Sequence, residues 1–461
     1  MTSRDLTYWD PEDARFWDDE GRAVASRNLA ISIPSLTLAF AVWMVWSAVV
    51  VNLPNVGFQF STEELFWLAA LPGLCGATLR VFYAFMVPIV GGRRWTAIST
   101  ASLLLPTVGI GVVVQDPATS YWTLAILALL CGFGGGNFAS SMANISFFFP
   151  KAQKGVALGL NAGLGNLGVS LVQFVVPVVI TAGLFGALGG EPQTWVKGSE
   201  AKQLWLQNAG FIWVPFIAFF AVAAWFGMND LASAEASFSE QAVIFKRKHN
   251  WIMCWLYLGT FGSFIGYSAG FPLLIKNQFP QINALSYAWL GPLVSALIRP
   301  FGGWLSDKLG GARVTLWSFI AMAAGVAGVL YFLPLEGQAG SFYGFLTMFM
   351  LLFTTAGIGN SSTFRMIPII FLNETQRAAA GRGREAEEQA VRDANKEAAA
   401  VLGFSSAIGA FGGFFIPMSY GFSISAFGGP AYALYMFIVF YLTCIVITWW
   451  YYARRNAEMP C

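Results

Sequence analysis

Long apolar runs recur along the whole chain and are separated by shorter polar segments. Each run has about 20 or more residues, which lets a helix cross a hydrocarbon core of ~30 Å. Helices are expected because backbone polar groups in lipid must be satisfied within their own segment. The pattern predicts an all-α membrane protein with twelve transmembrane helices, near residues 29–52, 64–90, 95–115, 119–149, 155–187, 209–228, 250–275, 283–308, 314–334, 342–372, 399–425 and 430–453.

The polar segments divide these runs into two groups of six. The predicted organisation is a tail at 1–28, a six-helix bundle at 29–228, a linker at 229–249, a second six-helix bundle at 250–453 and a closing tail at 454–461. Within the second bundle, residues 373–397 are rich in Glu, Arg and Ala, which predicts a solvated surface helix.

The positions of Lys and Arg indicate the orientation in the membrane. With the N-terminus in the cytoplasm, 20 of the 26 Lys and Arg fall on the inside, and only Lys197, Lys202 and Lys276 fall outside. Because short cytoplasmic loops carry an excess of these residues, we expect both termini to be cytoplasmic. We expect the chain to function as a monomer.

Two arginines lie inside predicted spans at matching places in the two halves. Arg80 and Arg299 are 219 residues apart, and each is followed at the same spacing by the pattern Gly-Gly-x-Arg-x-Thr, which begins at Gly91 and at Gly310. Counting the helical rise places each arginine about 16 Å from its Gly-Gly turn, roughly half-way through the bilayer. A charged residue at this depth is costly and indicates a functional site.

The chemistry of arginine indicates what such a site would bind. All Asp and Glu lie in tails, loops or span ends, and the one histidine, His249, lies in the predicted linker. Guanidinium stays protonated and offers a planar fork of donors that suits an oxyanion. The alternative is a pair of structural arginines bonded to helix carbonyls. We expect Arg80 and Arg299 to hold one small anion between the two halves.

The same inventory bears on mechanism. Two buried cations without an anion would disfavour a closed empty state, so movement would require cargo in both directions, which is exchange. The missing intramembrane Asp, Glu and His also remove the usual proton carriers. A proton-coupled symporter or a facilitator of a small anion remains the alternative. The sequence also shows no nucleotide site, cofactor motif, metal-ligand spacing, nucleic-acid signature or catalytic constellation, so we expect a transporter and not an enzyme.

Glycine-rich runs in the fifth and eleventh spans are the second repeat. They share glycines at matching spacing and carry the amides Asn161 and Asn166 in the first half. Glycine lets helices pack closely, and it also opens space and backbone for a small substrate. The second reading makes four further residues candidates for the substrate site: Gly163, Gly165, Ser406 and Gly409.

Aromatic residues are expected to complete the pocket. Phe138 follows an Asn in the fourth span, while Tyr257 and Phe261 lie one turn apart in the seventh. Planar anions can lie between ring faces while they bond in their own plane. A third buried arginine, Arg365, has no charged counterpart in the first half; it either extends to the cytoplasmic face or lines an inner anion path.

Several stretches resemble the nitrate/nitrite porter family of the major facilitator superfamily. The two signature helices are similar at Ala162–Gly168 and Ser406–Gly413, the second span at Gly76–Thr96 and the fourth at Asn137–Pro150. The loop at Gly302–Gly311 resembles the superfamily's loop motif, whose first-half copy lacks the acidic residue.

This resemblance covers nearly the whole chain and implies a twelve-helix transporter of nitrate and nitrite in the inner membrane of a bacterium. It implies that Arg80 and Arg299 bind the anion and that Phe138 and Phe261 sandwich it. Tyr257 and Asn166 match further family positions. Arg365 departs from the family pattern, and the family contains proton-coupled members, so the resemblance leaves the coupling open.

Overall fold

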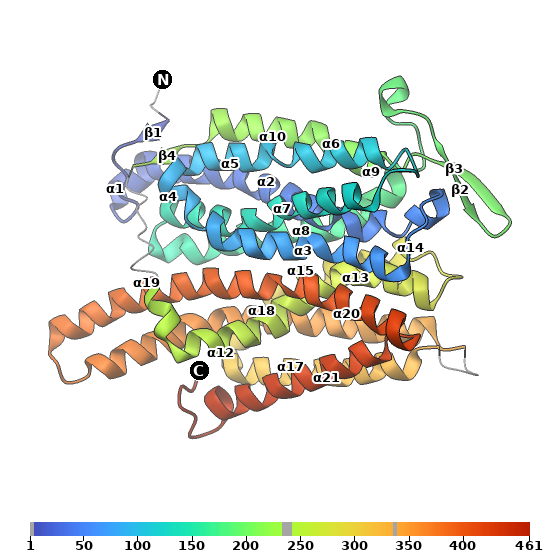
Figure 1. Ribbon diagram of the computed structural model, residues 1–461. Helices are drawn as coiled ribbons and strands as arrows, with labels where there is room; N and C mark the ends of the chain where they lie inside the picture. The colour runs from blue at the N-terminus through green and yellow to red at the C-terminus, as the bar shows by residue number, and fades with distance from the viewer. Residues whose placement is uncertain (1–3, 233–241, 335–338) are drawn as a thin grey trace. The chain divides into compact units, whose positions relative to one another are not determined.

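The computed structural model describes residues 4–232, 242–334 and 339–461, and these are predominantly helical (Figure 1). Part of the predicted linker, residues 233–241, lies outside the described residues. In the described part, eleven helical segments are long and apolar enough to cross a membrane. The prediction of an all-α, multi-pass membrane protein is therefore confirmed.

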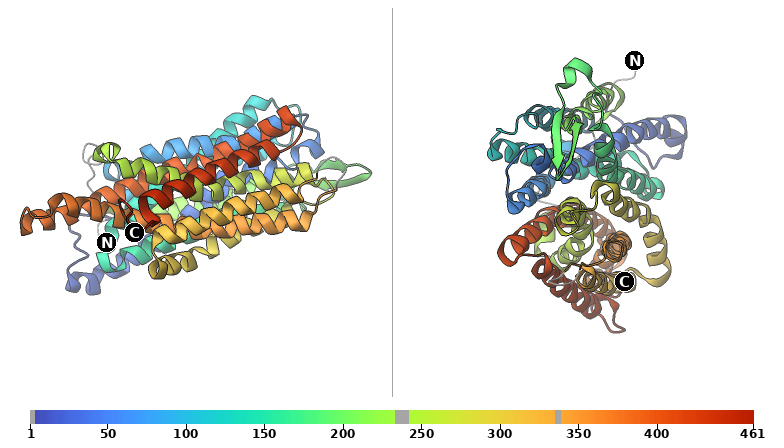
Figure 2. Two further views of the ribbon diagram at one scale, coloured as in Figure 1. Left: turned by 90° about the horizontal axis from the view of Figure 1, so that it is seen from below. Right: turned by 90° about the vertical axis from the view of Figure 1, so that its right-hand side faces the viewer.

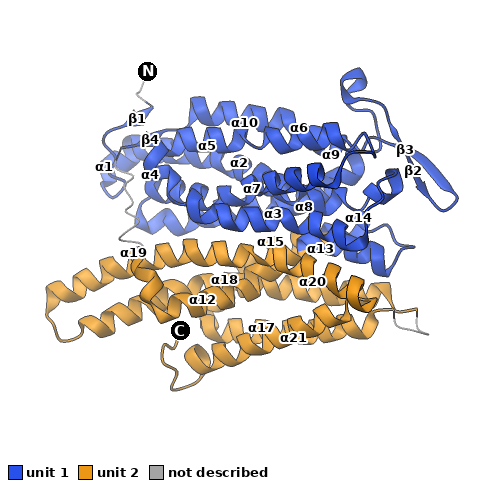
Figure 3. Cartoon of the chain, in the orientation of Figure 1, with its two compact units in different colours: residues 1–236, 268–289 blue, residues 237–267, 290–461 orange. Residues whose placement is uncertain are grey.

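The chain forms two compact units (Figure 3). Unit 1 comprises residues 1–236 and 268–289, and unit 2 comprises residues 237–267 and 290–461. Hydrogen bonds explain why 268–289 group with the first half. Gln173 Nε2 donates to the Ser268 carbonyl oxygen at 2.7 Å, and Ser170 Oγ donates to that of Trp289 at 2.9 Å.

Helices dominate unit 1, and several predicted spans consist of two helical pieces. Its helices are α1 (Ala14–Phe16), η1 (Trp17–Gly21), α2 (Arg22–Val49), η2 (Leu53–Val56), α3 (Thr62–Tyr83), α4 (Met86–Val90), α5 (Gly92–Ala101), α6 (Leu104–Val113), α7 (Tyr121–Phe148), α8 (Lys151–Val179), η3 (Gly186–Gly189), α9 (Asn208–Phe211), α10 (Val214–Gly227) and α14 (Leu285–Ala288).

Unit 2 contains the remaining helices and shares α13 with unit 1. These are η4 (Ala242–Lys246), α12 (Lys248–Tyr257), the π-helical turn η5 (Leu258–Gly262), α13 (Ser263–Gln278), α15 (Leu290–Leu297), α16 (Arg299–Leu309), α17 (Gly311–Phe332), α18 (Phe342–Ala379), α19 (Arg384–Ala410), α20 (Gly412–Phe427), α21 (Ala431–Thr448) and η6 (Trp449–Ala453).

The eighth predicted span is the one that does not form a long helix. Residues 283–308 are divided among α14, α15 and α16, with breaks at Trp289 and Ile298. Pro300 has no N–H to donate to the carbonyl of Ala296, which explains the second break. This interruption accounts for eleven long apolar helices where the sequence pattern predicts twelve, and it places Arg299 at the first position of a new helix.

The charged segment 373–397 differs from the separate surface helix predicted for it. Its residues continue α18 as far as Ala379 and begin α19 at Arg384, so a four-residue turn joins two long helices. Figures 1 and 2 show this hairpin, in orange, extending past the neighbouring helices of unit 2. The outer parts of α19 are charged and exposed, as the sequence predicts.

Two short strand pairs, which the sequence pattern does not predict, occur in unit 1. Strands β2 (Gln193–Lys197) and β3 (Glu200–Leu204) form an antiparallel hairpin. Strands β1 (Asp5–Leu6) and β4 (Asp230–Leu231) pair in parallel, so the polar N-terminal tail is bonded to the segment that follows α10.

Candidate functional site

A close contact between α3 and α7 positions Arg80. A Cβ added at Gly135 would lie 2.8 Å from the Cα of Gly76, and one added at Gly132 would lie 2.7 Å from the nitrogen of Gly76. This approach brings the Gly135 carbonyl oxygen within 2.8 Å of Arg80 Nε, which donates to it. Arg80 is 1% exposed, so its charge is buried within unit 1.

Aromatic rings surround the Arg80 guanidinium. Its central carbon lies 4.7 Å from the ring centroid of Phe138, 5.1 Å from that of Trp43 and 5.9 Å from that of Phe40. Ring faces attract cations, and the effect is strongest where water is excluded. Phe138 is a predicted site residue, and the structure places it against Arg80. Trp43 and Phe40 on α2 were missed, because nothing in the sequence distinguishes them among 18 Trp and 42 Phe.

Arg299 begins α16 in unit 2. Ser361 Oγ donates to the Arg299 carbonyl oxygen at 2.8 Å, which fixes the backbone of Arg299 to α18. Its guanidinium carbon lies 5.0 Å from the ring centroid of Phe264 and 6.0 Å from that of Phe261. Phe261 is a predicted site residue, whereas Phe264 was missed.

The Arg299 guanidinium has donors without partners. Among the described residues, its Nε and Nη2 atoms are buried and have no hydrogen-bond acceptor. A buried unsatisfied donor is costly, and a charged one more so. The Nε of Arg80, by contrast, is bonded to a helix carbonyl. Arg299 therefore has two buried donors that a bound acceptor could satisfy, and a small oxyanion is such an acceptor.

The two aromatic residues predicted for the seventh span lie where α12 continues into the π-helical turn η5: Tyr257 ends α12 and Phe261 lies in η5. The ring centroids of Tyr257 and Phe261 are 5.7 Å apart and the planes are inclined by 40°. A Cβ at Gly409 would lie 2.8 Å from Cδ1 of Tyr257 and 3.2 Å from Cδ1 of Phe261. Gly409 is thus placed beside both rings, where its missing side chain lets α19 pack against them.

The signature-helix residues differ in what surrounds them. Asn166 is fully buried, and its Nδ2 donates to the Ala162 carbonyl oxygen at 2.7 Å within α8. A Cβ at Gly165 would meet Leu36 at 2.7 Å, whereas one at Gly163 would meet nothing within 4 Å. The geometry therefore gives Gly165 a packing role, while Gly163 borders open space.

Two further polar residues of these helices make local bonds. Asn161 Nδ2 donates to Ser141 Oγ at 2.8 Å, which ties α8 to α7. Ser406 Oγ donates to the Gly403 carbonyl oxygen at 2.8 Å within α19. Asn161 thus bonds to a neighbouring helix, whereas Ser406 bonds within its own helix.

Arg365, the third arginine inside a predicted span, is partly exposed and has an acidic partner. Arg365 Nη1 lies 2.6 Å from Asp307 Oδ1 and also donates to the Ser306 carbonyl oxygen at 3.2 Å. Asp307 belongs to the second copy of the loop motif and lies in the last turn of α16. The ion pair ties α18 to this loop, so Arg365 is accounted for without a bound anion.

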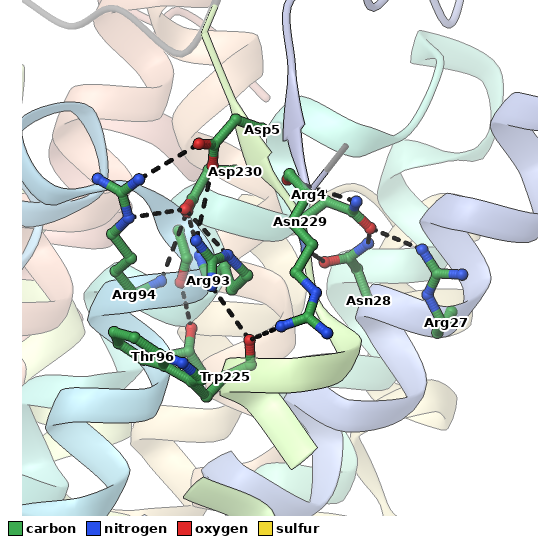
Figure 4. Close-up of polar contacts among 11 residues, drawn as sticks. Arg4, Asp5, Arg27, Asn28, Arg93, Arg94, Thr96, Trp225, Asn229 and Asp230 are labelled. Atoms are coloured by element: carbon green, nitrogen blue, oxygen red, sulfur yellow. Dashed lines mark hydrogen bonds and ion pairs between the residues drawn. The ribbon is translucent and has the colours of Figure 1, made fainter. Parts of the chain in front are cut away.

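Asp230 supplies the acid that the first copy of the loop motif lacks (Figure 4). Its carboxylate accepts from the backbone N–H of Arg93 at 2.7 Å and from Arg93 Nε at 3.1 Å, and it lies 3.4 Å from Arg94 Nε. A Cβ at Gly91 would lie 2.5 Å from this carboxylate, so the motif glycine makes room for it. Asp230 is far away in sequence, which is why the motif alone did not reveal the pair.

The N-terminal tail joins the same cluster. Asp5 lies 3.6 Å from Arg93 Nη2 and 3.3 Å from Arg94 Nη2. Asn229, next to Asp230, accepts from Arg27 Nη2 at 2.7 Å and exchanges hydrogen bonds with Asn28 (Figure 4). The cluster connects the tail, α2, α5 and the end of α10 within unit 1.

Comparisons with known proteins identify the fold and the family. Residues 35–383 match the Major Facilitator Superfamily. The chain is 53% identical to the nitrate/nitrite transporter NarU of Salmonella typhimurium over 98% of this chain and 97% of that protein. It is 43% identical to the probable nitrate/nitrite antiporter NarK2 of Thermus thermophilus over 99% of this chain and 98% of that protein.

Solved structures support the fold alone. The nucleoside transporter NupG superposes with a TM-score of 0.62 at 11% identity, covering 92% of this chain and 98% of that one. A bacterial homologue of the human lysosomal transporter Spinster, in an inward-facing and occupied conformation, also gives 0.62, at 14% identity and 92% and 96% coverage.

The fold and these matches define a membrane transporter of the major facilitator type, and not an enzyme. Within that superfamily, the chain belongs to the nitrate/nitrite porter family.

Proposed function

We propose that this chain transports nitrate and nitrite, exchanging one anion for the other. The relatives named for nitrate/nitrite transport match it over nearly its full length. The observation that carries the site is the Arg299 guanidinium beside the rings of Phe264 and Phe261, because its Nε and Nη2 are buried and have no acceptor in the described part of the chain. A planar monoanion satisfies both donors with parallel, charge-assisted bonds.

Arg80 is the proposed second ligand. It is the counterpart of Arg299 in the sequence repeat, and Phe138 lies against its guanidinium. Tyr257 and Phe261 contribute the aromatic wall in unit 2. Asn166 and Ser406 act through their helices, because each bonds to a carbonyl of its own helix. Gly163 leaves open space, and Gly409 keeps the aromatic wall in place.

Exchange follows from the charge inventory. The apolar interiors of the spans contain arginine but no Asp, Glu or His, so no protein group there can carry a proton in place of an anion. A transporter that returned empty would leave permanently charged guanidinium groups buried without their anion. A returning nitrite or nitrate removes this cost. We place both termini in the cytoplasm and the protein in the bacterial inner membrane.

Counterflow in proteoliposomes tests the proposal. Vesicles containing nitrite should accumulate labelled nitrate, whereas vesicles without an internal anion should take up little. Robust uptake into anion-free vesicles driven by a pH gradient would instead support proton symport.

Arginine-to-lysine variants test the site. Arg299→Lys and Arg80→Lys keep the charge but lose the fork, and losing one charge-assisted hydrogen bond of about 1.5–3 kcal/mol lowers nitrate affinity by roughly 10- to 100-fold. Arg392→Lys is the matched control, because Arg392 is exposed on α19 and bonds only to Gln389 among the interactions described. Normal affinity in both site variants would refute recognition by the paired donors.

A further inference from the structure

Two cavities adjoin at one end of unit 2, apart from the proposed anion site. The first has a volume of about 490 Å³ and is lined mostly by apolar side chains, among them Leu305, Val314 and Trp317. The second has a volume of about 460 Å³ and is lined by three arginines, Arg313, Arg454 and Arg455. Tyr452 and Pro460 are among its other lining residues. Both cavities include Leu309 and Arg313, so an apolar groove leads directly into a basic pocket.

The arginines that follow the Gly-Gly turns have different acidic partners in the two halves of the chain. In the first half, Asp230 lies against both Arg93 and Arg94. In the second half, the loop acid Asp307 pairs with Arg365 instead. Arg313, the counterpart of Arg94 in the repeat, is exposed and has no ion pair within the described part of the chain. The repeat therefore leaves one motif arginine available in unit 2.

The other two arginines of the pocket are also without acidic partners among residues 4–232, 242–334 and 339–461. Arg454 Nε is buried with no hydrogen-bond acceptor, and the guanidinium carbon lies 4.2 Å from the ring centroid of Trp450. The nearby carboxylate of Glu458 is bonded to Lys248 at 2.6 Å. Even if Cys461 carries a terminal carboxylate, three guanidinium groups leave the pocket positively charged.

The groove beside this pocket has the character of a lipid-facing surface. Trp317 is 68% exposed and Leu309 is 52% exposed, although both belong to the apolar wall. Arg313 stands near the first turn of α17, at the end of a span, where the headgroup region of a bilayer begins. A ligand that fills both cavities must therefore carry an anionic head and an apolar tail.

We infer that the second unit binds an anionic phospholipid at this place. Its phosphate accepts hydrogen bonds from Arg313, Arg454 and Arg455, and one acyl chain lies in the groove along Trp317 and Leu309. Basic pockets between membrane helices bind anionic headgroups through the same chemistry. This inference does not depend on which anion the protein transports.

Native mass spectrometry of the full-length protein tests this inference. The protein is equilibrated with equal amounts of phosphatidylglycerol and phosphatidylcholine, and the bound lipid is measured after detergent exchange. We expect preferential retention of one phosphatidylglycerol. In the triple variant Arg313→Gln, Arg454→Gln, Arg455→Gln, retention should weaken about fivefold per arginine, or about a hundredfold in total.

A matched triple variant removes three exposed arginines from the α18–α19 hairpin: Arg382→Gln, Arg384→Gln and Arg392→Gln. It loses the same charge and should retain the lipid like the parent. Equal retention in the pocket variant and the parent would overturn the inference. If the pocket variant fails to fold, the parent protein still tests the inference, because equal retention of phosphatidylglycerol and phosphatidylcholine by the parent contradicts a site for an anionic headgroup.

Competition separates a lipid from a soluble anion. Glycerophosphoglycerol has the same headgroup without acyl chains, and inorganic phosphate has only the charge. If the groove contributes, neither displaces the bound lipid at concentrations a hundredfold above those of added phosphatidylglycerol. Displacement by either compound at comparable concentration would show that the pocket is a soluble-anion site.

Discussion

Replacing Asp230 with Asn should destabilise the protein much more than the same change at Asp307. The Asp230 and Arg93 side chains are 11% and 9% exposed, so this ion pair is nearly excluded from water. Asn keeps an acceptor for the backbone N–H of Arg93 but removes the buried carboxylate beside its guanidinium, which leaves only the exposed Asp5, at 3.6 Å, as a counter-charge. Breaking a buried pair costs about 3–5 kcal/mol, and we expect about 3 kcal/mol because one acceptor remains.

The Asp307–Arg365 pair provides the internal comparison. These side chains are 66% and 35% exposed, so water screens the interaction and its loss should cost about 0–1 kcal/mol. For a unit of about 200 residues, each kcal/mol shifts Tm by roughly 2–4 °C. Asp230→Asn should therefore lower Tm by roughly 6–12 °C, and Asp307→Asn by at most about 4 °C.

The Tm shifts of both variants are measured by thermal unfolding in the same detergent, with tryptophan fluorescence as the readout. The measurement should be repeated at high salt, because a screened surface pair weakens with ionic strength and a buried pair does so far less. Equal shifts for the two variants, or a larger one for Asp307→Asn, would show that burial does not set the strength of these pairs.

Three further predictions concern single side chains. Arg299→Gln should abolish measurable nitrate counterflow while leaving Tm unchanged or higher, because it removes a buried charge whose Nε and Nη2 have no hydrogen-bond acceptor among the described residues; unimpaired counterflow would exclude Arg299 from the site. Gly409→Ala should lower the free energy of unfolding by about 1–3 kcal/mol, and with it Tm, because the added Cβ would lie 2.8 Å from Tyr257. Gly163→Ala should be neutral or stabilising, because its Cβ would have no neighbour within 4 Å. Desolvation raises the pKa of the partly buried Cys461 thiol to about 12, so at pH 8 its thiolate fraction is about a thousandfold below that of an ordinary thiol. Maleimide should therefore label it slowly in the native protein and faster in the unfolded protein, and rapid labelling of the native protein would contradict the raised pKa.

The apolar pattern predicts most helices because it reports directly on which residues can face lipid. The fourth predicted span, 119–149, corresponds to α7 at Tyr121–Phe148 within two residues. The break of the eighth span at Ile298 depends on tertiary packing as well as on Pro300, which permits it. The hydrophobicity pattern alone therefore does not reveal it. The hairpin of β2 and β3 was missed because its strands are short and polar.

In the candidate site too, some features are visible in the sequence and others appear only in the folded chain. The repeat identified Arg80 and Arg299 because a charge in an apolar run is conspicuous whatever its surroundings. Their different bonding depends on which carbonyl approaches the guanidinium, and that follows from the glycine contact of α3 with α7. Phe264 and Trp43 are ordinary aromatic residues in sequence, so only the folded chain distinguishes them.

The pairing of β1 with β4 has a consequence for biosynthesis. Asp5 and Leu6 leave the ribosome long before Asp230 and Leu231, their partners in the finished structure. At about 5–20 residues per second, the wait is roughly 10–45 s. During that interval neither the β1–β4 pairing nor the contacts of Asp230 with Arg93 and Arg94 can form, so Asp5 alone can join the N-terminal tail to the Arg93–Arg94 turn.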